Sequence, residues 1–224
     1  MTKRRRFVMP VVQFALDVRS ADEARSIAEM GIRAGVDWLE AGTPLILFSG
    51  IPVVGKVASA FPGRRIVADI KIVDGARKYV IAAASQGADV VTICGVASDA
   101  SIREAVAGGR EAGIQVAVDL YASPDPVVRA REVVGMGADL VYLHYGGDPW
   151  AADPAGDRTL ALVPALRETV DVPIGFATAS TDSAVGAVEA GADIVAIGYP
   201  FLTGPDAEAM LTELVQRVRS AARV

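Results

Sequence analysis

A short motif repeats four times along the chain and limits the possible folds more than any other feature of the sequence. Each copy has a glycine after a helix-like segment, then alanine or valine, an aspartate and an apolar run; the glycines are Gly35, Gly87, Gly137 and Gly191, at intervals of 50 to 54 residues. Glycine at this point favours a left-handed helix cap, and the β-branched run after it is typical of a strand buried on both faces. The chain is therefore predicted to repeat a helix–strand unit.

Four more apolar runs lie between those that follow the motif, at residues 11–16, 65–70, 114–120 and 172–176. Amphipathic helical patterns separate the runs, for example at 21–33, 76–86, 102–112, 126–136 and 207–218. Eight strands alternating with eight helices predict an α/β protein, a single-domain (β/α)₈ TIM barrel over residues 10–224. The alternative, an open doubly wound sheet, usually has a Gly-rich turn after its first strand, whereas residues 17–20 read Asp-Val-Arg-Ser.

The charge balance excludes one class of partner. Lysine and arginine number 22 against 27 aspartates and glutamates, and four of the cations lie together at residues 3–6, in a basic tail over 1–9. The barrel itself is thus acidic, so we expect no nucleic-acid partner. Pro10 interrupts the apolar run after the tail, and no run is long enough for a membrane span. We expect a soluble cytoplasmic protein without a membrane partner, in which the single cysteine, Cys94, is a buried core thiol.

Charged side chains interrupt the apolar runs at the ends of the predicted strands. In strand order they are Asp17, Glu40, Asp69 with Lys71, Asp119 and His144. The carboxyl ends of barrel strands meet at one rim, where the catalytic groups of this fold lie. Glu40 and Asp69 supply hard oxygen ligands of the kind that suit Mg²⁺. The pattern predicts a site that binds a cation and transfers protons, although Glu40 could also be a satisfied core acid.

Simpler roles stay open for the other charged residues. Asp69 and Lys71 lie two apart on a strand and so point to the same side, where they could form only an ion pair. Asp74 follows in the next turn and could cap the next helix. Asp119 could merely hold a lysine, and His144 could be a packing residue, although its place at a strand end beside a loop favours catalysis.

The strand ends also carry a combined pattern, Glu-x-Gly-Thr-Pro at residues 40–44 and Asp-x-Lys-x-x-Asp at 69–74, with Ala-Leu-Asp at 15–17. Segments 95–99, 118–120 and 125–126 and His144 extend it. This pattern resembles the 3-hexulose-6-phosphate synthases and their relatives, the 3-keto-L-gulonate-6-phosphate decarboxylases, both of the orotidine monophosphate decarboxylase suprafamily. The resemblance runs from about Val11 over essentially the whole chain.

The resemblance implies a Mg²⁺-assisted lyase that passes through a 1,2-enediolate. It implies that Glu40 and Asp69 bind the metal and that Lys71 stabilises the developing oxyanion or relays a proton. His144 is implied as an acid or base, and Asp17 as a group that orients substrate and moves protons.

The relatives also imply a partner. Their residue matching Asp74 enters the active site of the neighbouring subunit, so a homodimer with two shared catalytic sites is implied. Asp119, within the matching segment 118–120, is expected to contact the substrate, a ketose or ketose phosphate.

Two segments depart from the family pattern at the phosphate-binding end. The relatives carry a Gly-Gly pair after the seventh strand and a small or cationic residue after the eighth, whose N–H groups bind the substrate phosphate. Here Thr178 and Ala179 replace the pair, and Tyr199 follows the retained Gly198. Side chains at these positions hinder the close approach of backbone to a phosphate.

Two interpretations follow from these departures. In the first, Thr178, Ser180 and the following helix N-terminus still bind phosphate, with Gly198. In the second, which we favour, Tyr199 and Phe201 stack on an unphosphorylated or differently shaped substrate. The Pro/Asp/Gly-rich stretch 147–157 is long enough for a flap, in which Trp150 either covers the substrate or docks the loop onto the barrel.

The leading hypothesis is a Mg²⁺-dependent aldehyde-lyase or decarboxylase of the hexulose-phosphate synthase type, with an altered substrate. One alternative is an epimerase, isomerase or aldolase that acts on an unphosphorylated sugar-like substrate. The other is a catalytically silent sugar-binding barrel.

Overall fold

The computed structural model describes Phe7 and residues 9–221, so the basic residues 3–6 lie outside the described residues. Its eight parallel strands form one closed barrel in sequence order, because β1 pairs with both β2 and β8. The strands are β1 (Val11–Leu16), β2 (Trp38–Ala41), β3 (Arg65–Ile72), β4 (Val90–Cys94), β5 (Gln115–Asp119), β6 (Leu140–His144), β7 (Ile174–Ala177) and β8 (Ile194–Ile197). The predicted TIM barrel is confirmed.

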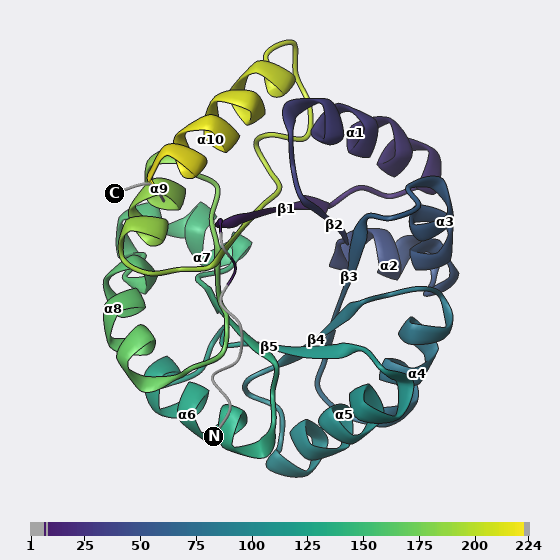
Figure 1. The fold of residues 1–224 in the computed structure, drawn as a ribbon, viewed down its shortest axis with the longest axis vertical. Helices are drawn as coiled ribbons and strands as arrows, with labels where there is room; N and C mark the ends of the chain where they lie inside the picture. The colour runs from purple at the N-terminus through teal and green to yellow at the C-terminus, as the bar shows by residue number, and fades with distance from the viewer. Residues whose placement is uncertain (1–6, 8, 222–224) are drawn as a thin grey trace.

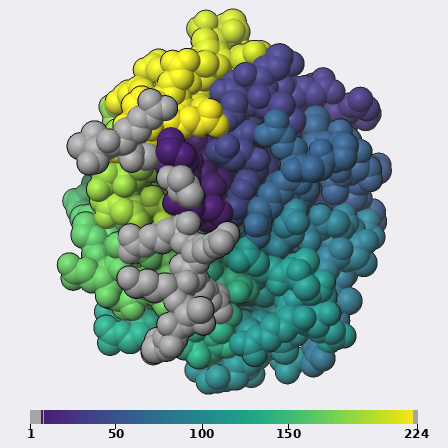
Figure 2. All heavy atoms as spheres, in the orientation of Figure 1, coloured from purple at the N-terminus to yellow at the C-terminus, as the bar shows by residue number. Residues whose placement is uncertain are grey.

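Helices surround the barrel as an outer ring (Figure 1). They are α1 (Ala21–Ala34), α3 (Pro52–Ala60), α4 (Ala76–Ser85), α5 (Asp99–Ala112), α6 (Pro126–Met136), α8 (Thr159–Thr169), α9 (Thr181–Glu189) and α10 (Ala207–Ala221). The two most distant of these in sequence, α1 and α10, pack side by side and complete the ring (Figures 1 and 2).

The described residues contain ten α-helices, two more than the eight expected. The additional helices are α2 (Thr43–Ser49) and α7 (Gly147–Ala152), the latter followed by a 3₁₀ turn, η1 (Pro154–Gly156). Both follow the C-terminal ends of strands. Pro44 in the first turn favours α2. The first N–H groups of a helix have no acceptor within the helix, so the N–H that proline lacks is not missed there. The stretch 147–157, expected as a flap-like loop, is thus folded into short helical turns that stand over the barrel mouth.

The repeated motif has a structural meaning at the opposite, N-terminal end of the barrel. Its four glycines all have positive φ, between 85° and 110°, as expected. Each aspartate after them exchanges hydrogen bonds with the backbone at the start of the preceding strand. Asp37 bonds Val12, Asp89 bonds Ile66, Asp139 bonds Val116 and Asp193 bonds Ile174, with side-chain oxygens 2.8–3.0 Å from the amide nitrogens. The aspartates therefore join neighbouring strands in pairs.

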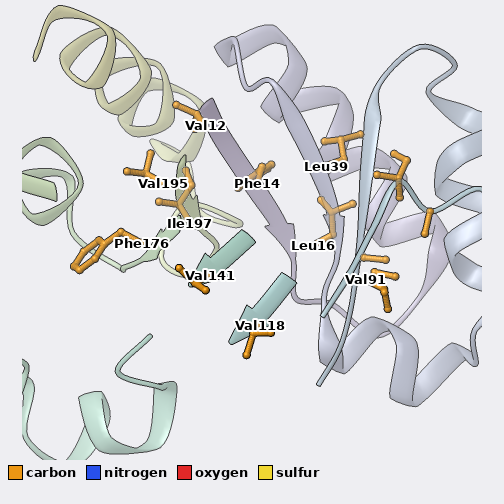
Figure 3. Close-up of a cluster of buried hydrophobic side chains, with 14 of the residues drawn as sticks. Val12, Phe14, Leu16, Leu39, Val91, Val118, Val141, Phe176, Val195 and Ile197 are labelled. Atoms are coloured by element: carbon orange, nitrogen blue, oxygen red, sulfur yellow. The ribbon is translucent and has the colours of Figure 1, made fainter. Parts of the chain in front are cut away.

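Side chains alternate between the two faces of each strand, so the protein has two apolar cores, one outside the barrel wall and one inside it. Outward-facing residues such as Val12, Phe14 and Val195 pack between strands and helices (Figure 3). Inward-facing residues form a second apolar cluster inside the barrel: Val11, Trp38, Val67, Val90, Ala117, Leu140, Tyr142, Ile194 and Ala196. On β1 the same face continues through Gln13 and Ala15 towards Asp17. The barrel interior thus changes from apolar to charged along its axis, which creates the site.

Two further expectations concern Cys94 and the membrane. Cys94 is buried at the end of β4, as predicted, and burial followed by the charge of Asp119 raises the pKa of its thiol to about 11. Among the described residues no single helix is long and apolar enough to cross a membrane; α2 and α3 reach that length only as a pair bent by 116°.

Candidate active site

A cavity of about 520 Å³ opens at the C-terminal rim of the barrel. This volume suits a small-molecule ligand. Nine of the predicted site residues line it: Asp17, Glu40, Asp69, Lys71, Asp119, His144, Thr178, Gly198 and Tyr199. Closure of the barrel has therefore brought together residues from seven strands or the loops that follow them.

Lys71 lies at the centre of the charged groups. Its Nζ is 2.8 Å from Asp69 Oδ2 and 3.1 Å from Asp119 Oδ2. Burial alone would lower the pKa of Lys71, but the two carboxylates raise it, so the ammonium group stays charged. An ammonium has three donor hydrogens, and these two contacts leave one for a ligand. A backbone irregularity places this side chain: β3 shifts register between Ala68 and Ile72, and Lys71 has a φ of 52°.

Asp69 is held on all sides by donors. Thr43 Oγ1 lies 2.7 Å from Oδ2, and Thr92 Oγ1 lies 2.6 Å from Oδ1. The two threonines come from α2 and β4, on either side of β3. Asp69 is only 7% exposed, so these contacts fix its carboxylate in one orientation.

Asp119 connects the lysine to the histidine. Its Oδ2 is 2.9 Å from His144 Nδ1, and its Oδ1 accepts from the Tyr121 N–H at 2.9 Å. Burial would raise the pKa of Asp119, but His144, Lys71 and the Tyr121 amide lower it to about 2. An ionised carboxylate only accepts, so Nδ1 must carry the hydrogen and Nε2 remains for the ligand. The interpretation that Asp119 holds a lysine agrees with this geometry, and Asp119 holds the histidine as well.

Glu40 is anchored by residues that the sequence analysis missed. Gln13 Nε2 donates a short hydrogen bond to Glu40 Oε2, and Tyr142 donates to Gln13 Oε1 at 2.6 Å. Gly175 leaves room for the Tyr142 ring, since a methyl group there would lie 2.3 Å from it. Burial, followed by the charges of Asp69 and Asp17, raises the pKa of Glu40 well above its usual value.

Asp17 lies between two glycines from neighbouring strand ends. A methyl group at Gly42 would lie 2.0 Å from Asp17 Oδ1, and one at Gly198 would lie 2.9 Å from Oδ2. Gly198 therefore makes room for an acid as well as lining the cavity. The Asp17 side chain faces the cavity and is partly exposed there. The protein around it still removes much of its water, and this desolvation, followed by repulsion from Asp69, raises the pKa of Asp17 to about 6.

The acids fit a divalent cation that is completed by other ligands. No group of three Asp, Glu, His or Cys side chains within the described ranges is placed to hold a metal ion unaided. Mg²⁺, however, is commonly bound by one or two carboxylates with water or substrate oxygens. Burial raises the pKa of Glu40 and Asp17, and repulsion among the acids raises it further; a cation would relieve that repulsion.

Two residues lie elsewhere than the functional interpretation required, and a third does not take the alternative role of a helix cap. Phe201 is 2% exposed and packs in the hydrophobic core, so the expectation that it stacks on substrate is wrong. Ser180 does not line the cavity; its Oγ accepts from the Ser183 N–H and caps α9. Asp74 is exposed, lies outside the cavity of its own chain and does not cap α4, because the capping position is Gly75.

The other end of the cavity is aromatic. Tyr145, between β6 and α7, and Trp150, on α7, line it together with Tyr199, which follows β8. Trp150 and Tyr199 remain 39% and 67% exposed. Trp150 therefore borders the cavity rather than packing into the core.

A simple signal could have revealed the missed polar residues. Gln13 lies on β1 four residues before Asp17, which directly follows the strand, so both can point to the inner face, and Thr92 interrupts the apolar β4 in the same way. A polar residue in the middle of a strand buried on both faces needs a partner. Tyr142 gives no such signal, since an aromatic residue is ordinary in a buried strand.

Comparison with known proteins gives the family. The profile of the orotidine 5'-phosphate decarboxylase / HUMPS family matches residues 10–214. The chain belongs to this family. Within it, the chain is 39% identical over 137 residues to 3-hexulose-6-phosphate synthase 3 of Staphylococcus saprophyticus, covering 61% of this chain and 65%, slightly under two thirds, of that relative. It is 35% identical over 163 residues to the 3-hexulose-6-phosphate synthase of Staphylococcus aureus strain USA300, covering 73% and 77%.

Solved structures of the HUMPS family agree with the fold. A crystal structure of 3-hexulose-6-phosphate synthase has a TM-score of 0.84 and 31% identity, covering 94% of this chain and 99% of that one. The Streptococcus mutans KGPDC in complex with D-R5P has a TM-score of 0.84 at 22% identity, covering 95% and 98%, and at this identity shows a shared fold. The resemblance recognised in the sequence is confirmed.

Proposed function

We propose that this protein is a Mg²⁺-assisted carbon–carbon lyase that passes through a 1,2-enediolate and acts on a ketose or ketose phosphate. The observation that carries the proposal is the position of Lys71 between Asp69 and Asp119, in one cavity with Glu40 and His144. Relatives named 3-hexulose-6-phosphate synthase support a reaction of the aldol type, ribulose 5-phosphate with formaldehyde; decarboxylation of a keto-gulonate phosphate is the related outcome.

The side chains divide the chemistry among them. Glu40 and Asp69 would hold Mg²⁺, which would supply positive charge to the substrate oxygens. The free N–H of Lys71 donates to the oxygen on which negative charge develops. His144 Nε2 accepts or returns the proton at carbon, while Asp119 holds both side chains in position.

Asp17 completes the proton transfer in this proposal. Its pKa of about 6 lets it exchange a proton near neutral pH, and it lies on the same cavity wall as Glu40. We assign it the role of orienting a substrate hydroxyl and accepting its hydrogen.

We also propose a homodimer in which Asp74 reaches the partner's cavity. Asp74 is exposed and lies outside the cavity of its own chain. Exposed apolar side chains accompany it, Val73 next to it and Leu47 and Phe48 on α2, and a second copy would cover them. Mixing inactive Lys71→Ala and Asp74→Ala variants should restore activity through hybrid dimers with one intact site, and absence of any restoration contradicts the shared site. The cytoplasmic location stays a prediction of the sequence.

The experiment that tests the reaction is an assay with D-ribulose 5-phosphate, formaldehyde and Mg²⁺, run beside D-ribulose in D₂O and followed by NMR. Formaldehyde consumption that EDTA abolishes supports the enediolate lyase. Exchange without any change of carbon skeleton points instead to an epimerase or isomerase. No reaction, together with no rise of the melting temperature on adding Mg²⁺, contradicts the proposal and favours a silent sugar-binding barrel.

A further inference from the structure

The cavity has two ends of opposite chemistry, since the acids and Lys71 come from the arc of the closed barrel that β1–β5 form and the aromatic residues from the arc of β6–β8. One end holds the acids and Lys71, where the reaction of the proposed function takes place. The far end is bounded by the segments that follow β6, β7 and β8, and its wall consists of aromatic and small residues: Tyr145, Trp150, Ala177, Thr178, Ala179 and Tyr199. A substrate that reaches both ends must present different groups to them.

The far end is poorly suited to a phosphate. Within the part of the chain that the structure describes, Lys71 is the lone lysine in the wall and no arginine lines it, and that lysine already binds Asp69 and Asp119. Asp157 also lines the cavity, and its carboxylate would repel an anion. A bound dianion here would lack a cation to offset its charge.

Three backbone N–H groups near this end are engaged within the protein. The Thr178 N–H donates to the Ala196 carbonyl at 3.0 Å, and the Ser180 N–H donates to Thr178 Oγ1 at 3.1 Å. At the start of α9, the Ser183 N–H donates to Ser180 Oγ at 3.3 Å. Thr178 and Ser180, two of the residues on which the phosphate interpretation depended, thus stabilise their own turn through these contacts.

Two of the aromatic side chains at this end are only partly covered by the rest of the protein. Trp150 is 39% exposed and Tyr199 is 67% exposed, although large aromatic side chains gain most from burial. The Tyr145 hydroxyl donates to the Asp153 carbonyl at 3.1 Å, which anchors its ring beside the cavity. A flat apolar group entering between these rings would cover them and displace water from both surfaces.

We propose that the far end of the cavity binds an uncharged, flat apolar group, an aromatic ring or its equivalent, attached to the hydroxyketone unit on which the acidic end acts. We call the hydroxyketone unit the head of the substrate and the apolar group its tail. The inference rests on the proposed function for the head and on the aromatic wall for the tail. The substrate class is therefore a ring-bearing hydroxyketone rather than a sugar phosphate.

Three hydroxamates test the inference by calorimetry in the presence of Mg²⁺, because their two neighbouring oxygens resemble an enediolate. Acetohydroxamate carries the head alone, 3-phenylpropionohydroxamate adds a ring, and phosphoglycolohydroxamate adds a phosphate. Burial of a ring should tighten binding about 10- to 100-fold over acetohydroxamate, whereas the phosphate should give no gain. A phosphate-bearing ligand that binds more tightly than the ring-bearing one overturns the inference and leaves the proposed function standing.

Variants locate the effect. Trp150→Ala and Tyr199→Ala should each reduce the gain from the ring without changing the affinity for acetohydroxamate, and Tyr199→Arg should create a gain from the phosphate. Tyr79→Ala, at an exposed tyrosine of α4 outside the cavity wall, is the matched control and should change nothing. A ring effect that persists in both alanine variants contradicts the assignment.

Two probes without a head separate this inference from the proposed function. If no hydroxamate binds, the proposed head chemistry fails, and the tail is then tested by benzyl alcohol and inorganic phosphate through the indole N–H resonance of Trp150. A shift with benzyl alcohol alone supports the apolar tail site. A shift with phosphate alone, or with neither, overturns it.

Discussion

The two ends of the barrel each carry acidic residues but use them differently. At the N-terminal end, Asp37, Asp89, Asp139 and Asp193 are distributed around the barrel, and each binds the backbone amide of a preceding strand. At the C-terminal end, Asp17, Glu40, Asp69 and Asp119 are gathered in one cavity. Each acid of the first set has a backbone donor, whereas in the second set Glu40 and Asp17 are repelled by the neighbouring Asp69.

The difference shows in the pKa values. Burial, with the charges of neighbouring acids, raises the pKa of Glu40 and of Asp17, and Asp119 stays ionised only because His144 and Lys71 accompany it. Crowding acids in a low dielectric costs stability, so it is kept where it serves chemistry. The N-terminal acids therefore maintain the fold, whereas the C-terminal acids are those to which we assign the proposed reaction.

The largest expected effect on stability is at the N-terminal end, with Asp193→Ala. The change leaves the Ile174 N–H without its acceptor and the buried Arg167 guanidinium without its ion-pair partner, now 2.7 Å away. We expect the free energy of unfolding in urea to fall by about 3–5 kcal/mol.

The control for Asp193→Ala is Asp37→Ala. Its ion pair with Arg219 is more exposed, so the loss should be only about 1–3 kcal/mol, mainly from the Val12 N–H. Both variants should keep the Mg²⁺-dependent rise in melting temperature. Equal losses in the two variants contradict the assigned importance of the buried pair.

At the C-terminal end, Lys71→Met should remove the charge while keeping an apolar stem of similar length. We expect the rate of the Mg²⁺-dependent reaction to fall about 10²- to 10³-fold, because the donor to the developing oxyanion is lost. The far-UV circular dichroism spectrum should be unchanged. Lys78→Met, at an exposed lysine of α4 outside the cavity, should retain full activity, and an active Lys71→Met variant argues against the mechanism.

The smallest expected change, and one of opposite sign, is that of Glu40→Gln. The amide still accepts from Gln13 but no longer repels Asp69 and Asp17, so stability should rise by about 0.5–2 kcal/mol. The rise in melting temperature caused by Mg²⁺ should disappear. Glu29→Gln, in the exposed pair with Arg25, is the control and should leave both quantities nearly unchanged. A destabilised Glu40→Gln variant with intact Mg²⁺ binding would mean that Glu40 is a structural acid.

Much of the site could be predicted because the barrel converts strand position into spatial position. Asp17, Glu40, Asp69, Asp119 and His144 each end an apolar run, and parallel strands that close on themselves must bring those ends together. The same rule does not extend to the loops. Ser180 and Phe201 follow β7 and β8 just as Thr178 and Tyr199 do, yet only the latter pair lines the cavity.

The repeated helix-capping glycines and the buried strands were enough to predict the barrel from the amino-acid sequence, together with the acids that lie at its C-terminal rim. The tertiary structure alone decided the partners across the barrel. Gln13 and Tyr142 are 129 residues apart and meet because the strands close into a ring that turns both side chains inward. It also decided that Phe201 fills the core while Tyr199 remains exposed beside the cavity, because burial depends on which neighbouring elements cover a loop and not on the residue type.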